Sequence, residues 1–249
     1  MTWLEAAAVF AAGTAAGTIN AVVGAGTLIS FPTLLALGYP PVLANVSNTV
    51  GLTPGSVSAV IGYRRELAGQ RSRLVRLGTA SAAGGVAGGL LLLRLPSAAF
   101  DAVVPVLIAI GCLLVLTQPI VNRWLGSRRV AAPRGSLLVW ALVFAAGVYG
   151  GYFGAAQGVL LMAILGIGLN ETMQRANAAK NVLAAIVNGV AALLFVLVAH
   201  VAWAAAALIA LGSVLGGQLG AKVGRLLPDP LLRATVAVVG ATAIFTLRT

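Results

Sequence analysis

Two clusters of amide, hydroxyl and amine side chains interrupt a mostly apolar chain, and each follows a short apolar run that ends in glycine. The first cluster, ANVSNT, contains Asn45 and Asn48, and the second, ANAAKN, contains Asn177, Lys180 and Asn181. Amide and ammonium N–H groups donate hydrogen bonds, so they suit an anionic ligand. Polar residues inside apolar segments tend to mark substrate or ion pathways. We therefore predict that these five residues bind a small anion.

Both clusters also have structural interpretations. An Asn near a helix start can cap it, which would account for Asn45 and Asn177 but not for the other polar residues. Lys180 lies about one turn into an apolar helix, where a charge is costly unless it reaches water or a partner. Its side chain could extend to the membrane surface, or it could face a cavity and hold the anion. In the second case, Lys180→Ala should weaken anion binding without unfolding the protein.

A glycine-rich break precedes each cluster. Glycine lets the backbone leave a helix and approach a ligand closely. The helix that follows begins with unpaired N–H groups and a partial positive charge, which attract anions. We expect the N–H groups of residues 26–28 and 157–159 to contact the anion; the alternative is that the glycines only permit close helix packing. The breaks, NAVVGAGT and GGYFGAAQG, contribute the candidate residues Gly24, Gly26, Thr27, Gly154, Gln157 and Gly158.

The composition indicates a membrane protein. Of 249 residues, 60% are hydrophobic and 8% are charged, whereas a soluble domain carries roughly 25% charged residues. The net charge of +11 does not indicate a nucleic-acid partner, because the basic residues lie between apolar runs, where they orient membrane segments. One His and one Cys do not make a metal site. No catalytic triad and no GxxxxGK[ST] motif are present, so we predict neither an enzyme nor a cofactor.

The apolar segments predict an all-α, polytopic membrane protein made of two related halves. Runs of about 20 residues can span a membrane, whereas the runs at 27–38 and 157–168 suit re-entrant half-helices. Gly24 and Gly154 are 130 positions apart, and Gly84 and Gly216 are 132 apart, so the chain is predicted to be a duplication. The predicted parts are repeat 1 (1–122: re-entrant pair 3–38, spans 44–63, 74–94, 98–121), a basic linker (123–135) and repeat 2 (136–249: re-entrant pair 136–168, spans 177–199, 202–224, 229–247).

The basic residues predict how the halves are oriented. If each broken pair returns to the side from which it entered, three spans follow it in each half, and 14 of the 16 Lys and Arg residues lie on one face, all except Arg94 and Arg248. The positive-inside rule favours this arrangement. It gives an odd number of spans per half, so the halves are inverted. The basic linker is then cytoplasmic, and both termini are outside.

The paired motifs resemble the sulfite exporter TauE/SafE family. The resemblance lies in NAVVGAGTLISFPTLLALG with ANVSNTV, and in GGYFGAAQGVLLMAILGIG with RANAAKNVLAAIVNG, and it extends over essentially the whole chain. It implies a multi-pass inner-membrane transporter of anionic sulfur compounds, such as sulfite, sulfoacetate or related sulfonates. The second half departs from a full glycine run at Ala155, Ala156 and Gln157, which bears on the substrate and not on the fold.

Together these features predict a secondary transporter that moves a small anion by alternating access around the two breaks. Because no nucleotide motif is present, we expect coupling to the proton or to the membrane potential. Two other functions stay open, a passive anion channel and a membrane scaffold or assembly factor without transport activity. The expected partners are the anionic substrate and the lipid bilayer, and the sequence leaves a homodimer open.

Overall fold

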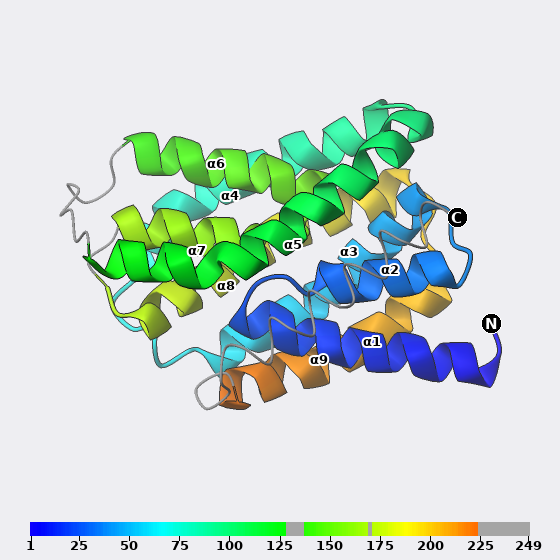
Figure 1. The fold of residues 1–249 in the computed structure, drawn as a ribbon, viewed down its shortest axis with the longest axis horizontal. Helices are drawn as coiled ribbons and strands as arrows, with labels where there is room; N and C mark the ends of the chain where they lie inside the picture. Colours follow the sequence, from blue (N-terminus) through cyan, green and yellow to red (C-terminus); the bar gives the residue numbers. More distant parts are fainter. Residues whose placement is uncertain (128–136, 169–170, 224–249) are drawn as a thin grey trace.

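The computed structural model describes residues 1–127, 137–168 and 171–223. Within these ranges the chain forms nine α-helices and no strand, which confirms the all-α prediction (Figure 1). The predicted span at 229–247 lies outside the described residues, as does the linker beyond residue 127. The helices are α1 (Trp3–Val22), α2 (Thr27–Ala36), α3 (Pro41–Gly62), α4 (Arg71–Arg94), α5 (Ser97–Ser127), α6 (Leu137–Tyr152), α7 (Gln157–Gly168), α8 (Met173–Val198) and α9 (Trp203–Val223).

Four of these helices, α4, α5, α8 and α9, are long and apolar enough to cross a membrane. The chain is thus a polytopic helical protein, as predicted. Helix α3 has 22 residues but is not among the four. Its amide and hydroxyl residues lower its hydropathy, and several of them, including Asn45 and Asn48, are fully buried. The polar side of α3 therefore faces the protein interior and not the lipid.

Residues at the helix starts explain several of the element boundaries. Thr2 and Glu5 form a reciprocal capping box at the start of α1, in which each side chain accepts a hydrogen bond from the other residue's backbone N–H. Thr172 caps α8 by accepting from the N–H of Arg175 at 3.4 Å. Helix α3 begins at Pro41, where proline fits because the first N–H of a helix needs no intrahelical partner.

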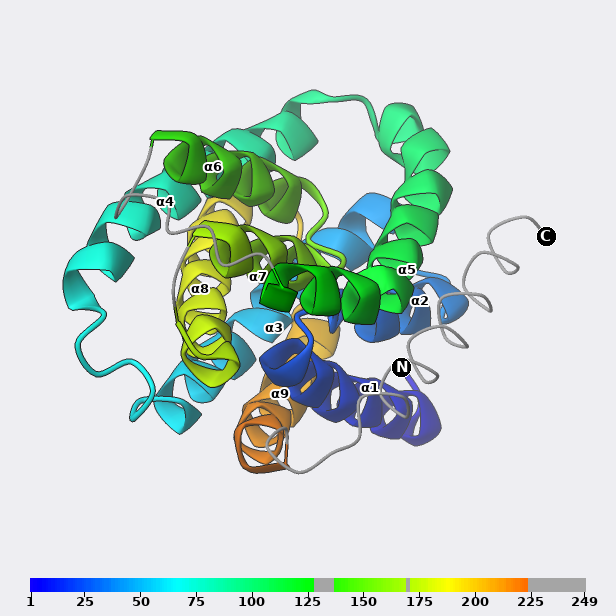
Figure 2. The same cartoon turned by 60° about the vertical axis from the view of Figure 1, so that its left-hand side comes forward.

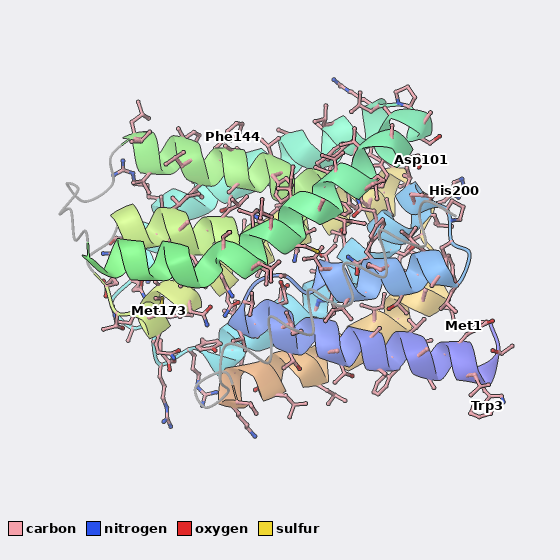
Figure 3. The ribbon with its side chains drawn as sticks, in the orientation of Figure 1. Met1, Trp3, Asp101, Phe144, Met173 and His200 are labelled. Carbon is pink, nitrogen blue, oxygen red and sulfur yellow. The ribbon has the colours of Figure 1, made fainter. Side chains whose placement is uncertain are left out.

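Two helices are interrupted and followed by a short helix that turns back. Helix α1 ends at Val22 and α2 begins at Thr27, while α6 ends at Tyr152 and α7 begins at Gln157. Helix α1 enters the bundle from the end where Trp3 and His200 lie, and α6 enters from the opposite end, where Met173 lies (Figures 1 and 3). The two breaks are thus approached from opposite directions.

Each interrupted helix packs against a glycine-rich helix of the other half. Helix α1 lies on α9, and α6 lies on α4 (Figure 2). A Cβ added to Gly216 of α9 would lie 2.1 Å from the carbonyl oxygen of Thr14, and one added to Gly84 of α4 would lie 2.4 Å from that of Phe144. These glycines therefore allow direct contact between the helix backbones.

The two glycine contacts occupy matching positions in the halves. Gly84 and Gly216 differ by 132, and Thr14 and Phe144 differ by 130, the two offsets of the duplication. The same contact is therefore made twice, with the partners exchanged between halves. This agrees with a twofold relation, but the inverted repeat stays a prediction, because residues 224–249 of the second half lie outside the described chain.

Candidate functional site

The two breaks touch each other through their backbones. Gly24 and Gly154 have φ angles of 84° and 76°, in the left-handed region that glycine adopts readily. The N–H of Gly158, in the first turn of α7, donates to the carbonyl of Gly24 at 3.0 Å. A Cβ on either Gly24 or Gly158 would lie 2.3 Å from the other residue's Cα. Glycine is thus required at both positions for the breaks to meet.

The C-terminal end of α1 is held by three residues of α8. Carbonyl groups in the last turn of a helix lack intrahelical partners. The carbonyl of Ala21 accepts from the amides of Asn177 at 3.2 Å and Asn181 at 3.1 Å, and from the ammonium of Lys180 at 3.2 Å. Lys180 also donates to the carbonyl of Asn20 at 3.0 Å. This contact brings together the three predicted residues of the second polar cluster.

Lys180 is fully buried. Its side chain therefore does not extend to the membrane surface, and that interpretation is wrong. Its positive charge lies at the negative end of the α1 dipole, where a cation is favoured. Among the described residues it forms no ion pair, and its polar contacts are the two α1 carbonyls. In this conformation, Lys180 secures a helix end.

The end of α6 has one comparable contact. The amide of Asn45, on α3, donates to the carbonyl of Tyr152 at 2.9 Å. Asn45 and Asn177 are matching residues of the two halves, and each reaches the interrupted helix of the other half. Neither caps its own helix, because Pro40 and Thr172 occupy the N-cap positions. The alternative interpretation of Asn45 and Asn177 as N-caps is therefore wrong.

Asn48, on α3, contacts the start of α2. Its amide nitrogen is 3.4 Å from the hydroxyl of Thr27, and its amide oxygen accepts a hydrogen bond from the hydroxyl of Ser30. All three side chains are buried. Gly26 packs against α1, because a Cβ there would lie 2.3 Å from the carbonyl oxygen of Ala16. The site prediction missed Ser30, whose signal is its position one turn after Gly26.

Gln157 is the first residue of α7 and is 3% exposed. Its amide nitrogen has no hydrogen-bond partner. The side chain lies over Gly150, where a Cβ would be 2.2 Å from its amide carbon. An unpaired buried donor is rare and costs about 1–3 kcal/mol. The positive end of α7 and this donor together favour a negatively charged ligand.

The backbone around this break is also unusual. Ala156 has a φ of 57°, a left-handed conformation that costs a non-glycine residue energy and often marks a functional site. The N–H groups of Gln157 and Val159 donate to carbonyls within the turn, and that of Gly158 donates to Gly24. The predicted backbone anion contacts of α7 are thus occupied in this conformation.

A second set of polar side chains, of which Ser56 is buried, was missed from the sequence. Ser56 accepts hydrogen bonds from the amides of Asn188 at 3.1 Å and Asn20 at 3.4 Å. Ser56 and Asn188 are separated by 132 positions, so matching residues of α3 and α8 meet each other. Their signal in the sequence is that a polar residue occupies matching positions of the apolar spans 44–63 and 177–199.

An ion-pair network joins two helix starts at the end of the bundle where α8 begins. Glu171 pairs with Arg73 of α4 at 3.0 Å and with Arg175 of α8 at 2.6 Å. Partial burial alone would raise the pKa of Glu171, but the hydrogen bonds and charges of both arginines lower it below its usual value. Across residues 1–127, 137–168 and 171–223, no three His, Cys, Asp or Glu side chains gather as metal ligands would.

Comparison with known proteins places this chain in a family. The profile described as "Sulfite exporter TauE/SafE" matches residues 9–247. The chain belongs to this family. It is 27% identical over 227 residues to the "Probable membrane transporter protein YfcA" of Escherichia coli strain K12, covering 91% of this chain and 83% of that protein.

Two other relatives of this chain have similar names. A "Probable membrane transporter protein" of Haemophilus influenzae is 28% identical over 235 residues, or 93% of this chain and 90% of its own. The "Probable membrane transporter protein ORF9" of a Sinorhizobium species is 28% identical over 220 residues, or 86% and 80%. No solved structure matched the chain. The family resemblance is thus confirmed, and the chain is a multi-pass protein of a membrane transporter family.

Proposed function

We propose that this chain is a secondary transporter of a small anion, with its binding site where the two breaks meet. The observation that carries the proposal is the unpaired amide of Gln157, buried at the start of α7 beside the Gly24–Gly158 contact. A buried donor at a positive helix end lacks the acceptor that an oxyanion would supply. The family description and the resemblance favour a sulfur oxyanion or organosulfonate as that anion.

The contact between the breaks suggests how access would alternate. With Gly24 and Gly158 in contact, the N–H of Gly158 is occupied and the two interrupted helices meet inside the bundle. Parting the breaks would release that N–H beside the amide of Gln157, so that both could donate to an anion. Closing them would expel the anion. Such movement of one half against the other is common in transporters built from repeats.

The test is transport by the purified chain in liposomes. Labelled sulfite, sulfate, thiosulfate and an organosulfonate are compared with acetate, at concentrations that define KM. We expect saturable flux for at least one sulfur anion. Gln157→Leu should raise KM roughly tenfold, because a hydrogen bond to a charged group is lost.

Gln218→Leu is the matched control, because the amide of Gln218 is satisfied by Ser58 at 2.8 Å and lies on α9. It should lower thermal stability and leave KM unchanged. Absence of flux for every anion, with a partner protein co-purifying, would instead indicate a scaffold. Flux that does not saturate and far exceeds carrier rates would indicate a channel.

A further inference from the structure

The two seams between neighbouring helices of different halves are not equally closed. Helices α3 and α9 form one seam, and their matching helices α8 and α4 form the other. On α3, Gly51, Gly55 and Gly62 face α9 so closely that a Cβ on each would lie 2.3–2.7 Å from a side chain of α9. Glycine on α3 therefore closes the first seam along most of its length.

Larger residues occupy the same positions on α8. Adding 132 to the three glycine numbers gives Leu183, Val187 and Leu194. A Cβ on Gly85 of α4 would still lie 3.2 Å from Val187, and α4 can approach no further. The side chains of α8 thus keep α4 at a greater distance, whereas the glycines of α3 allow α9 to pack closely.

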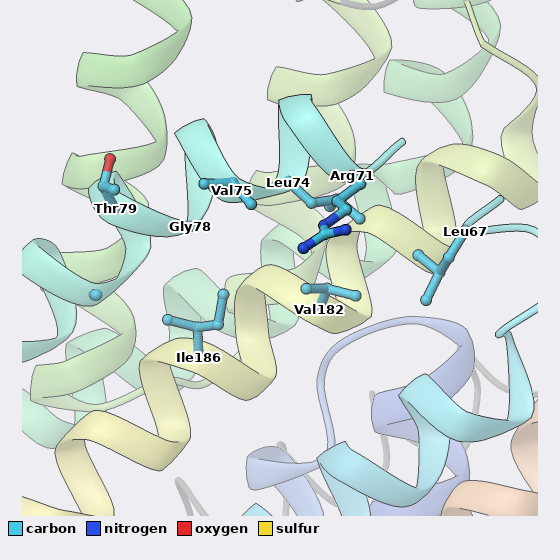
Figure 4. A pocket seen from close by; sticks show the side chains of 9 residues that line it. Leu67, Arg71, Leu74, Val75, Gly78, Thr79, Val182 and Ile186 are labelled. Atoms are coloured by element: carbon cyan, nitrogen blue, oxygen red, sulfur yellow. The ribbon is translucent and has the colours of Figure 1, made fainter. Parts of the chain in front are cut away.

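An open groove lies at one end of the α4–α8 seam. Its volume is about 530 Å³, and its walls include Leu74, Val75, Gly78, Val182 and Ile186 (Figure 4). All of these wall residues are apolar and belong to helices long and apolar enough to span a membrane. A groove of this kind accommodates a hydrocarbon chain and not a soluble polar molecule.

A single cation lies at the mouth of the groove. Arg71, at the start of α4, lines it, and its guanidinium group extends toward Val182 (Figure 4). Arg73 and Arg175 are engaged by Glu171. In the described part of the chain, the side chain of Arg71 forms no hydrogen bond or ion pair. Its five N–H donors are therefore free to bind a phosphate group, which matches their geometry.

We propose that this groove is a binding site for an anionic phospholipid, with the phosphate on Arg71 and one acyl chain between α4 and α8. Charge complementarity selects an anionic head group. The apolar walls select a lipid over free phosphate. Basic pockets between membrane helices bind anionic lipids in this way. The bound chain would fill the space that the larger side chains of α8 leave open, and it would brace α4 against α8.

The test measures lipid binding to the purified full-length protein in detergent, by native mass spectrometry and thermal unfolding. Phosphatidylglycerol, phosphatidylcholine and glycerol phosphate are the three probes. We expect bound phosphatidylglycerol and a raised unfolding temperature, with little effect of the other two. Arg71→Gln should reduce phosphatidylglycerol occupancy about fivefold, as expected for one basic residue at an anionic lipid.

Val75→Trp tests the groove walls. Val75 is 64% exposed, so the larger ring should fill the groove without disturbing the core, and it should abolish the lipid-induced shift. Matched controls are Arg65→Gln, which removes an exposed charge outside the groove, and Leu91→Trp, which adds the same ring to an exposed position farther along α4.

Equal binding of phosphatidylcholine, or unchanged binding in Arg71→Gln, would overturn the proposal. Stabilisation by glycerol phosphate alone would show a phosphate site without a lipid. Transport is not measured, so these outcomes are independent of the proposed function.

Discussion

The break between α1 and α2 and the break between α6 and α7 differ in how the preceding helix end is held. Three donors, one of them charged, bind the carbonyl end of α1. A single amide, that of Asn45, binds the end of α6. The second break also contains the left-handed Ala156 and the unpaired amide of Gln157. The first break is thus held by more donors, whereas the second contains a buried amide donor without a partner.

Matching residues of the two halves contact helix ends of opposite partial charge. Lys180 and Asn48 are separated by 132 positions and correspond in the two halves. Lys180, on α8, contacts the C-terminal end of α1, which favours a cation. Asn48, on α3, contacts the N-terminal end of α2, which favours an anion or an acceptor. The positive charge of Lys180, in the second polar cluster, therefore stabilises the helix end at the first break.

Charge substitution at these two positions should give the largest effect. Lys180→Glu would bury a carboxylate against two carbonyl oxygens and should destabilise the protein by about 4 kcal/mol or prevent folding. Asn48→Asp would place a carboxylate beside two hydroxyl donors and a helix start, and should cost much less. Thermal unfolding in detergent compares them, with exposed Lys222→Glu as control. A stable Lys180→Glu would show that this position reaches water.

Separating the breaks should have the next largest effect. Gly158→Ala places a Cβ 2.3 Å from the Cα of Gly24, so the backbones must move apart. Overpacking of this kind should cost about 2 kcal/mol, and anion flux should fall by at least roughly tenfold, because small misplacements of a site have large effects. Gly189→Ala on α8 is the control, since nothing lies within 4 Å of its Cβ. Equal flux in both variants would contradict a role for the contact.

Removing one amide donor from each helix end should have a smaller effect. Asn45→Leu leaves the carbonyl of Tyr152 without its side-chain donor, whereas Asn181→Leu leaves Ala21 with two. We expect Asn45→Leu to cost about 1–2 kcal/mol and Asn181→Leu roughly 0.5 kcal/mol, because an unsatisfied buried group costs more than one lost bond among several. Denaturant unfolding of both variants decides this. A larger loss of stability in Asn181→Leu than in Asn45→Leu would mean that the end of α1 depends on each of its donors separately.

The smallest effect concerns the ion pairs of Glu171, outside both breaks. Its pKa is lowered in the folded protein, so its contribution is present above the unfolded value near 4.5 and is lost as pH falls through the folded value. The stability difference between the native chain and Glu171→Gln should therefore be constant near neutral pH and disappear in acid. Unfolding measured from pH 7 to pH 3 provides the check. A difference that grows in acid would contradict the direction of the shift.

The sequence predicted the helices and the breaks because both have local signals. Apolar runs of fixed length predict spans, and Gly24 and Gly154 interrupt them where φ is positive. The contact between the breaks, and the convergence of Asn177, Lys180 and Asn181 on Ala21, had no such signal. Their acceptors are backbone carbonyls, which every residue carries, so the pairing depends on how the helices pack. The difference between the two seams was also missed, although the sequence places Gly51 and the larger Leu183 at matching positions.

The exchange of partners between the halves has a consequence for biosynthesis. Helix α1 packs on α9, and its carbonyl end is completed by α8. Ribosomes make α1 first and these two helices much later. The carbonyl groups at the end of α1 therefore lack their side-chain donors until α8 has been synthesised. Substitutions in α8 and α9 should then cause the N-terminal region to be degraded by quality-control proteases.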